Sequence, residues 1–227
     1  MLNMPRWASI ALVSFWPLLK AGLLFTIPLT LLSFALGLSL GLLTAFARMS
    51  RNPVILSIAR FYVWIFRGTP LLVQLFLIFY GLPNLGIIID AFPAAVIGFS
   101  LNVGAYSSET IRAAIGSVPK GQWDAAQALA MSWPQLMARV IIPQAARFAT
   151  PPLANSFISL VKDTSLAATL TVTEMFQAAQ RITAVTYEPL LLYAEAGILY
   201  LAFSSVLSAG QRRLELRLGR PLARGAP

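Results

Sequence analysis

The stretch GQWDAAQALAMSWPQLMARVIIP, residues 121–143, decides the fold, because it is the longest polar-looking segment in a largely apolar chain. Its first half is rich in alanine, a strong helix former, and predicts a helix that ends at Met131. Ser132 and Gln135 have the spacing of a capping box and predict a second helix, which we expect Pro143 to limit. The stretch therefore predicts a helix-turn-helix whose small and large apolar side chains form a docking surface for another protein.

The composition of the whole chain is that of an integral membrane protein. Of its 227 residues 58% are hydrophobic and 11% are charged, and the mean hydropathy is +0.75, which is more apolar surface than a soluble domain can bury. The absence of cysteine and histidine excludes thiol nucleophiles, disulfides and the commonest zinc and haem ligands, so we expect no metal and no cofactor. The net charge of +9 is expected to set membrane topology, and no nucleic-acid partner is predicted.

Apolar runs long enough to cross about 30 Å of hydrocarbon predict an all-α integral membrane domain over residues 21–209. We expect five transmembrane helices, at about residues 21–47, 61–82, 94–115, from 150 onward, and 189–207. Basic residues gather around the predicted coupling loop, residues 116–147, and in the basic tail, residues 210–227, so both are expected to be cytoplasmic, with the N-terminus outside. Residues 1–20, which we expect Pro17 to break, are interpreted as an interfacial segment.

The fourth predicted span carries two opposite charges, Lys162 and Asp163, followed by two hydroxyls, Thr164 and Ser165. A helix from Arg147 to Lys162 rises roughly 22 Å, at about 1.5 Å per residue, which places both charges inside the bilayer. Ionisable residues at such a depth are rare and indicate a function, and here they predict an interrupted helix that faces a polar cavity. Asp163 could bind the ammonium of an amino acid, and Lys162, the hydroxyls or free backbone N–H groups could bind its carboxylate. The alternative is a buried ion pair that holds helices together.

Other polar residues inside the predicted spans are further candidates for the translocation path. Glu109 and Arg112 are three residues apart and can pair on one helix face, where the pair would either close the cytoplasmic end of the bundle or line the path. Asn102 lies deeper and is the better lining candidate, whereas Glu195 could reach either a helix interface or the cavity. Arg67 is expected to snorkel toward the cytoplasmic face.

Several of these motifs resemble those of the permease subunits of bacterial ABC importers. The run DAA (124–126), Ala130 and the run VIIP (140–143) keep the spacing of the cytoplasmic signature of that family, with Asp in place of Glu at 124 and Ala in place of Gly at 130. The runs FRGTPL (66–71) and KDTSL (162–166) are similar to the polar amino acid group, which includes histidine, glutamine and cystine systems, and the similarity is strongest to the cystine type. The alternative for the signature is an ordinary amphipathic helix on the membrane surface.

The resemblance implies a type I ABC importer permease fold in a bacterial inner membrane, with a coupling helix-turn-helix that docks on a separate ATP-binding subunit. The docking residues that it implies are Gly121, Trp123, Asp124, Ala125, Ala126, Leu129, Ala130 and Pro143. It also implies a periplasmic amino acid-binding protein, a second permease subunit that is a copy of this chain or a related one, and surrounding membrane lipid. The cargo that it implies is a polar amino acid such as L-cystine.

The sequence contains no G-x-x-x-x-G-K-[ST] loop, so we expect ATP hydrolysis on a separate chain and no catalytic residues here. Two other functions remain open. An ion-coupled secondary amino acid transporter would use Glu109, Asp163 or Glu195 as proton or cation sites. A noncatalytic membrane scaffold would recruit a cytoplasmic partner through its loop and would transport nothing.

Overall fold

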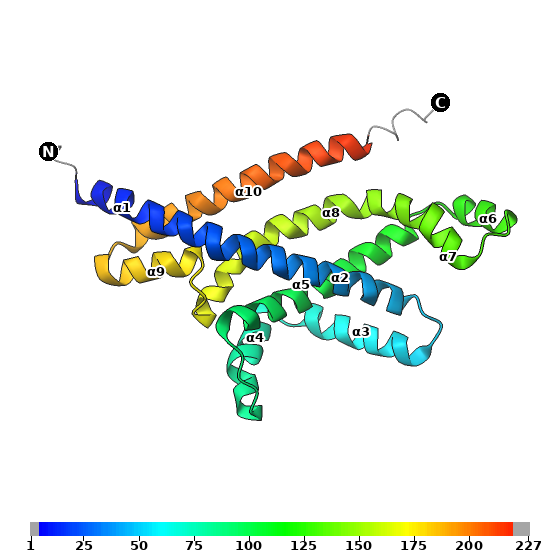
Figure 1. Cartoon of the computed structure of the whole chain (residues 1–227), viewed down its shortest axis with the longest axis horizontal. Coiled ribbons are helices and arrows are strands. Elements are labelled where there is room, and N and C mark those ends of the chain that lie inside the picture. The colour runs from blue at the N-terminus through cyan, green and yellow to red at the C-terminus, as the bar shows by residue number, and fades with distance from the viewer. Residues whose placement is uncertain (1–4, 220–227) are drawn as a thin grey trace. The chain divides into compact units, whose positions relative to one another are not determined.

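The computed structural model describes residues 5–219, with side chains up to residue 216, and within that range the chain is helical without any strand (Figure 1). This confirms the predicted all-helical class. The helices in chain order are α1 (Arg6–Ala21), α2 (Ile27–Arg48), α3 (Pro53–Gly68), α4 (Leu71–Phe76), α5 (Ala91–Gly116), α6 (Lys120–Ala128), α7 (Trp133–Leu136), α8 (Ile142–Asp163), α9 (Met175–Thr186) and α10 (Pro189–Gly219). Short π-helical or 3-10 segments join several of them, at Gly22–Thr26, Leu77–Gly81, Leu82–Leu85, Met137–Ile141 and Thr164–Leu170.

The chain forms two compact units, each with its own buried side chains. The described part of unit 1 comprises residues 5–35, 69–100 and 157–208, and that of unit 2 comprises residues 36–68, 101–156 and 209–219. In unit 1, buried residues of α1, α9 and α10 pack together, among them Leu18, Met175, Ala179, Ala196 and Leu199. Four helices, α2, α5, α8 and α10, run from one unit into the other along the chain.

The N-terminal segment is part of a much longer helix than expected. Helices α1 and α2, with the π-helical turn between them, form one candidate span, Arg6–Arg48, of 43 residues. The helix continues through Pro17, so the expected break there was wrong. A proline inside a helix removes one hydrogen bond and can bend the helix without ending it, and here the packed side chains of α1 hold the helix together. Whether residues 1–20 lie at a membrane interface stays a prediction.

The second predicted span is interrupted within the run FRGTPL (66–71). Helix α3 ends at Gly68 and α4 begins at Leu71. Pro70 is the N-cap of α4 and has an extended backbone, with φ −64° and ψ 137°. A proline disfavours helical angles at the residue before it, here Thr69, so the helix stops and starts again on the far side of the proline.

By length and apolarity, two helices in the described part of the chain can cross a membrane, Arg6–Arg48 and Pro189–Leu216. A third candidate span is the broken pair Pro53–Gly68 and Leu71–Leu85. The other two predicted spans lie on α5 and α8, so the number of five stays a prediction. Helix α8 begins earlier than the expected residue 150 and contains two internal prolines, Pro151 and Pro152.

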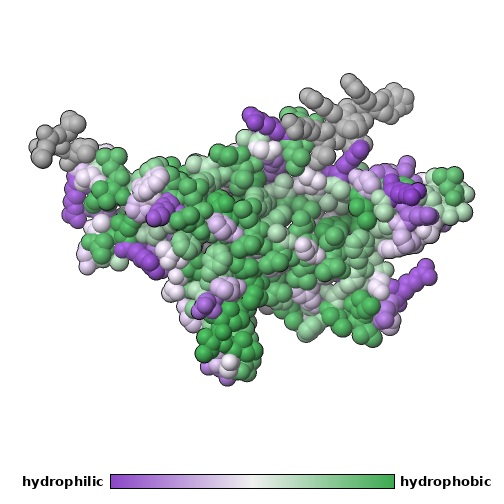
Figure 2. All heavy atoms as spheres, in the orientation of Figure 1, coloured by the Kyte–Doolittle hydropathy of each residue, from purple (hydrophilic) through white to green (hydrophobic). Residues whose placement is uncertain are grey.

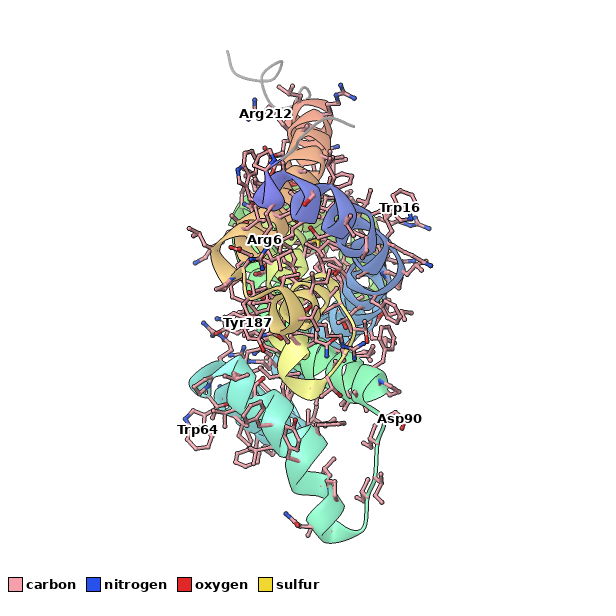
Figure 3. All side chains as sticks on the ribbon, turned by 90° about the vertical axis from the view of Figure 1, so that its left-hand side faces the viewer. Arg6, Trp16, Trp64, Asp90, Tyr187 and Arg212 are labelled. Carbon is pink, nitrogen blue, oxygen red and sulfur yellow. The ribbon has the colours of Figure 1, made fainter. Side chains whose placement is uncertain are left out.

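Much of the apolar surface of each unit faces outward. Trp16 in unit 1 is 65% exposed and Trp64 in unit 2 is 70% exposed, and each side chain projects away from its own helix (Figure 3). The visible face in Figure 2 carries broad apolar areas over the helices. Apolar patches of this extent are typical of surfaces that lipid or another protein covers. The predicted basic tail continues α10 as far as Gly219, and residues 220–227 lie outside the described part.

Gly41 marks a close crossing of α2 and α5 in unit 2. A Cβ atom at this position would lie 2.7 Å from the Cβ of Ser107 and 3.1 Å from the carbonyl oxygen of Gly104. Neither neighbour is the flexible end of a side chain, so the two helices would have to separate to admit a methyl group. The crossing therefore depends on a small residue in α2.

We expect Gly41→Ala to lower the free energy of unfolding by about 1–3 kcal/mol, because it overpacks this crossing. Gly197→Ala is the matched control, since an added Cβ there meets no heavy atom within 4 Å and alanine favours a helix. Thermal unfolding of the purified protein, followed by tryptophan fluorescence, measures both. Equal melting temperatures for the two variants would contradict the close crossing.

Candidate functional site

The predicted helix-turn-helix is present as α6 and α7, which lie beyond the ends of α5 and α8 in unit 2 (Figure 1). Helix α6 ends at Ala128, three residues before the expected end at Met131. The amide of Met131 donates to the carbonyl of Ala126 at 3.1 Å, and the amide of Ala130 donates to that of Gln127 at 2.8 Å. These two bonds form a Schellman motif, which satisfies the last carbonyls of the helix and turns the chain sharply.

The backbone conformation of Ala130 shows why the family signature has glycine at this position. Its φ is 53°, in the left-handed region that glycine adopts at no steric cost. An alanine there costs roughly 1 kcal/mol, yet the turn is formed. The change from Gly to Ala therefore leaves the tight turn of the coupling loop in place.

The second helix begins as predicted but does not end as predicted. Gln135 accepts a hydrogen bond from the backbone amide of Ser132 at 3.0 Å, which confirms the capping box. Pro143 was expected to limit the helix, and this was wrong, because α7 passes through the π-helical turn Met137–Ile141 into α8. The wider π turn, in which the amide of Ile142 reaches back to the carbonyl of Met137, makes room for a proline in the next position.

One face of the coupling turn is built into the core of unit 2. The buried residues of this core come from α2, α5, α6, α7, α8 and the segments that join them, and include Ala45, Ile111, Ala114, Ile115, Val118, Ala126, Leu136, Met137, Ile141, Ala145 and Ala149. Trp123 and Met131 pack against the same cluster from a half-buried position. The turn is thus packed against the helix ends and is not a loose surface loop.

The other face of the coupling turn is open. Leu129 is 77% exposed and Trp133 is 57% exposed, and Gly121, Asp124 and Ala125 are also exposed. Large apolar side chains held on the outside of a rigid turn are typical anchors of a protein interface. Ala126 requires a correction, because it is 3% exposed and packs inward, so it supports the turn and does not face a partner.

Glu109 of α5 binds three arginines in unit 2, not only the predicted one. Its carboxylate lies 2.6 Å from the guanidinium of Arg48 at the end of α2, 3.0 Å from that of Arg67 at the end of α3, and 3.0 Å from that of Arg112. The Arg67 guanidinium also stacks over the ring of Tyr106, 5.4 Å from its centre. The cluster joins α2, α3 and α5 through one carboxylate, which favours the interpretation of a structural closure. Arg67 is thus paired within the protein.

Asn102 also lies between α3 and α5. Its side-chain amide is 3.4 Å from the carbonyl of Phe66, one of the last residues of α3. Tyr62, one turn earlier, donates a shorter bond of 2.6 Å from its hydroxyl to the carbonyl of Leu101. These polar contacts fix the α3–α5 crossing in unit 2, and a lining role for Asn102 stays a prediction.

The predicted interruption after Lys162 and Asp163 is present in unit 1. The α-helix ends at Asp163 and continues as the 3-10 segment Thr164–Leu170. Both charged side chains are exposed, and neither forms an ion pair within the described residues. The Ser165 hydroxyl donates to the carbonyl of Lys162 at 2.7 Å. The alternative of a buried ion pair is therefore disfavoured, and the two charges stay available to a ligand or to another subunit.

Thr164 and Glu195 have inward partners instead. Thr164 is fully buried, and its hydroxyl donates to the carbonyl of Val161 at 2.7 Å. The carboxylate of Glu195 on α10 accepts a hydrogen bond of 2.5 Å from the hydroxyl of Ser14 on α1. This bond joins two helices of unit 1, so the geometry favours the helix-interface alternative for Glu195.

Two functional features escaped sequence reasoning. The partners of Glu109 at Arg48 and Arg67 are distant in sequence, and only the excess of arginine over acidic residues in the stretch 48–67 hinted at them. Glu174, which the sequence analysis did not single out, is fully buried and hydrogen bonded to Tyr200. Its position directly before the amphipathic run of α9 is typical of an N-cap and could have signalled this.

We expect Glu109→Gln to destabilise the protein by about 1–3 kcal/mol, between the values for exposed and buried ion pairs, because three guanidinium groups would share a neutral amide. Glu188→Gln is the control, since Glu188 forms no ion pair among residues 5–216. Melting temperatures of the purified variants at low and high salt measure both effects. A Glu109→Gln melting temperature equal to that of the control would show that the cluster contributes nothing.

Comparison with known proteins identifies the family of the chain. Residues 37–220 match the family described as "Binding-protein-dependent transport system inner membrane component". The L-cystine transport system permease protein TcyB of Bacillus subtilis (strain 168) is 51% identical over 93% of this chain and 91% of its own length. The arginine transport system permease protein ArtQ of the same organism is 35% identical over 89% of this chain and 93% of its own length.

Solved structures give the same answer for the fold. The crystal structure of an amino acid ABC transporter with histidines superposes with a TM-score of 0.88 at 36% sequence identity, covering 94% of this chain and 99% of that one. An inward-facing MetNI methionine ABC transporter, at 17% identity and a TM-score of 0.68, shares the fold. The resemblance found in the sequence is thereby confirmed, and the chain belongs to the family of binding-protein-dependent transport system inner membrane components.

Proposed function

We propose that this chain is the permease subunit of an ATP-driven importer for a polar amino acid and that the exposed face of α6 and α7 docks on a separate ATP-binding subunit. The observation that carries the proposal is the two-sided coupling turn. Leu129 and Trp133 are exposed on one side, while Ala126, Met137 and Ile141 are buried in the core of unit 2 on the other. A partner that binds the exposed side and moves it also moves the buried side, because both belong to the same packed turn.

This arrangement offers a direct route from a partner to the helices of unit 2. The core beneath the turn contains Ala45 of α2, Ile111 of α5 and Ala145 of α8. Close-packed side chains transmit displacement, because they cannot be compressed. A partner that binds one arrangement of these helix ends more tightly than another therefore shifts the population between inward-open and outward-open states.

The proposed cargo is a polar amino acid, and L-cystine is the specific candidate, because the L-cystine permease TcyB is 51% identical to this chain. Asp163 is exposed at the helix break and offers a carboxylate to an ammonium group. Lys162 beside it offers a cation to a carboxylate. An amino acid carries both groups, so the pair matches it in charge and number.

We further propose the assembly in which such a subunit works. Five spans in a bacterial inner membrane, with the N-terminus outside and the C-terminus inside, place α6 and α7 in the cytoplasm by the positive-inside rule. A second permease subunit, identical or related, completes the pathway, and a periplasmic amino acid-binding protein delivers the cargo. The match to a family described as binding-protein-dependent supports the last of these partners.

Leu129→Asp is expected to abolish recovery of the ATP-binding subunit with the purified permease, because it puts a charge on an apolar anchor. Val185→Asp, on α9, is the matched control, since the two side chains are 77% and 76% exposed. Co-purification of the two subunits at equal permease yield measures the effect. Ala126→Asp is expected to reduce the yield of folded permease itself, because Ala126 is buried. Unchanged recovery with Leu129→Asp would refute the docking role.

Asp163→Asn is expected to lower uptake of a labelled polar amino acid about tenfold or more, since a charge-assisted bond contributes roughly 1.5–3 kcal/mol. Asp90→Asn is the control, since Asp90 is an exposed aspartate that lies directly before α5 and outside α8. The assay uses vesicles that contain the permease with its ATP-binding subunit and binding protein, and a panel that includes L-cystine. Wild-type uptake with Asp163→Asn would show that this carboxylate does not contact the cargo.

The same vesicles separate the alternatives. An ATP-driven importer requires ATP at the face that carries the ATP-binding subunit and stops when that subunit is inactive. A secondary transporter responds to ion gradients without ATP, and a scaffold moves no amino acid. No contact among the described residues favours either alternative over the importer.

A further inference from the structure

A groove between α1 and α10 in unit 1 holds one carboxylate, that of Glu195, in an otherwise apolar lining. Its volume is about 340 Å³, far above the roughly 30 Å³ share of one water molecule, so it can admit a larger group. Leu12 and Ile198 at its walls are exposed, which opens the groove to the surroundings of the unit. The apolar lining consists of Ala11, Leu12 and Phe15 of α1 and Leu191, Ala194 and Ile198 of α10.

Glu195 has no cation to neutralise it. Among residues 5–216 it forms no ion pair, and its one hydrogen-bond contact joins Oε2 to the Ser14 hydroxyl at 2.5 Å. That hydroxyl has a single hydrogen and also lies 2.9 Å from the carbonyl of Ile10, so it gives the carboxylate one donor at most. The other oxygen, Oε1, faces no donor within the described residues. The carboxylate therefore has room for a donor that carries a positive charge.

The position of Glu195 along α10 places it at the edge of the hydrocarbon layer. Residues 196–211 contain no charged side chain, and Arg212 and Arg213 follow them. A helix from Glu195 to Arg212 rises about 26 Å, close to the roughly 30 Å of a hydrocarbon core. The candidate span Pro189–Leu216 has 28 residues and is longer than that thickness requires, so its ends can reach the headgroups. Because the arginines mark one boundary, Glu195 lies near the other.

Helix α1 brings the other wall of the groove to the same end of unit 1. The guanidinium of Arg6, the first residue of α1, donates to the carbonyl of Thr186 at 3.1 Å, and Thr186 ends α9 shortly before α10 begins. Trp7 beside Arg6 is exposed, and tryptophan is enriched at the level of lipid headgroups. The groove thus combines a carboxylate and an apolar channel at the level where a phospholipid has its polar head and the start of its acyl chains.

We propose that this groove binds a phospholipid whose headgroup ends in a primary ammonium, with the ammonium on Glu195 and an acyl chain along Leu12, Phe15 and Ile198. A primary ammonium has three N–H donors, so it can both neutralise a carboxylate and hydrogen bond to it, whereas a quaternary ammonium has none. Phe15 is the one aromatic residue of the lining, so the groove lacks the aromatic cage that holds quaternary ammonium groups.

An anionic headgroup would be repelled by Glu195, which favours an ammonium lipid over an acidic one. The inference requires that the chain lies in a membrane, but it does not rest on the proposed cargo or on the proposed ATP-binding partner. Its test below contains neither, so a failed uptake experiment leaves it untouched.

Native mass spectrometry of the full chain in detergent measures binding of added phosphatidylethanolamine and of phosphatidylcholine with the same acyl chains. We expect the wild type to bind phosphatidylethanolamine about three- to tenfold more tightly, as for a charge-assisted bond at a partly exposed carboxylate. Glu195→Gln should abolish this preference, while its amide oxygen can still accept from Ser14. Glu188→Gln is the matched control, since Glu188 directly precedes α10 and does not line the groove. Equal affinity of the wild type for the two lipids, or a preference that survives Glu195→Gln, would overturn the inference.

Ala194, an exposed residue of the lining, tests the apolar part of the site. Ala194→Phe fills the groove and is expected to weaken binding of both lipids by the same factor, leaving their ratio unchanged. Unchanged binding with this variant would show that the lipid lies elsewhere. Because the chain has no native cysteine, Ala194→Cys also reports whether a second copy of the chain covers the groove. We expect this variant to stay monomeric under mild oxidation in the membrane, and a disulfide-linked dimer would overturn the inference.

Discussion

The packing of the coupling turn against the helix ends of unit 2 is the constraint on which the rest depends. Ala126, Met137 and Ile141 fill the space beneath α6 and α7 and contact the core residues of α2, α5 and α8. Because a packed core does not yield, a turn held in this way can move only together with those helices. The outward face, which carries Leu129 and Trp133, is exposed and lies outside this packing, and it is the face that we propose docks on a partner.

Each unit also depends on one carboxylate with several donors. In unit 2, Glu109 gathers three guanidinium groups from the ends of α2, α3 and α5. In unit 1, Glu174 gathers two amides of α9 and the hydroxyl of Tyr200. A carboxylate in an apolar surrounding is costly unless its oxygens are satisfied, so each of these groups imposes a specific arrangement of helices. Asp163 has no such partners within the described residues and stays accessible, which suits a residue that meets a ligand.

Local sequence rules succeeded where the cause is local. The capping box at Ser132 and Gln135 follows from neighbouring residues and is present, and the helix break before Leu71 also has a local cause, Pro70. The rules failed at Pro17 and Pro143, where proline was expected to end or break a helix. The packing of α1 accommodates the ring of Pro17, and the π-helical turn before α8 accommodates the ring of Pro143. Neither feature can be inferred from the proline itself.

The sequence by itself determined that the chain is an apolar, helical protein with a cytoplasmic-type signature at residues 124–143, because composition, periodicity and motif spacing are properties of the chain alone. Only the tertiary structure decided which side chains of that signature face outward, turning Ala126 inward and leaving Leu129 exposed. It alone also brought Arg48 and Arg67 to Glu109, and Tyr200 to Glu174. Such contacts join residues that are far apart in sequence, and no local pattern encodes the helix packing that brings them together.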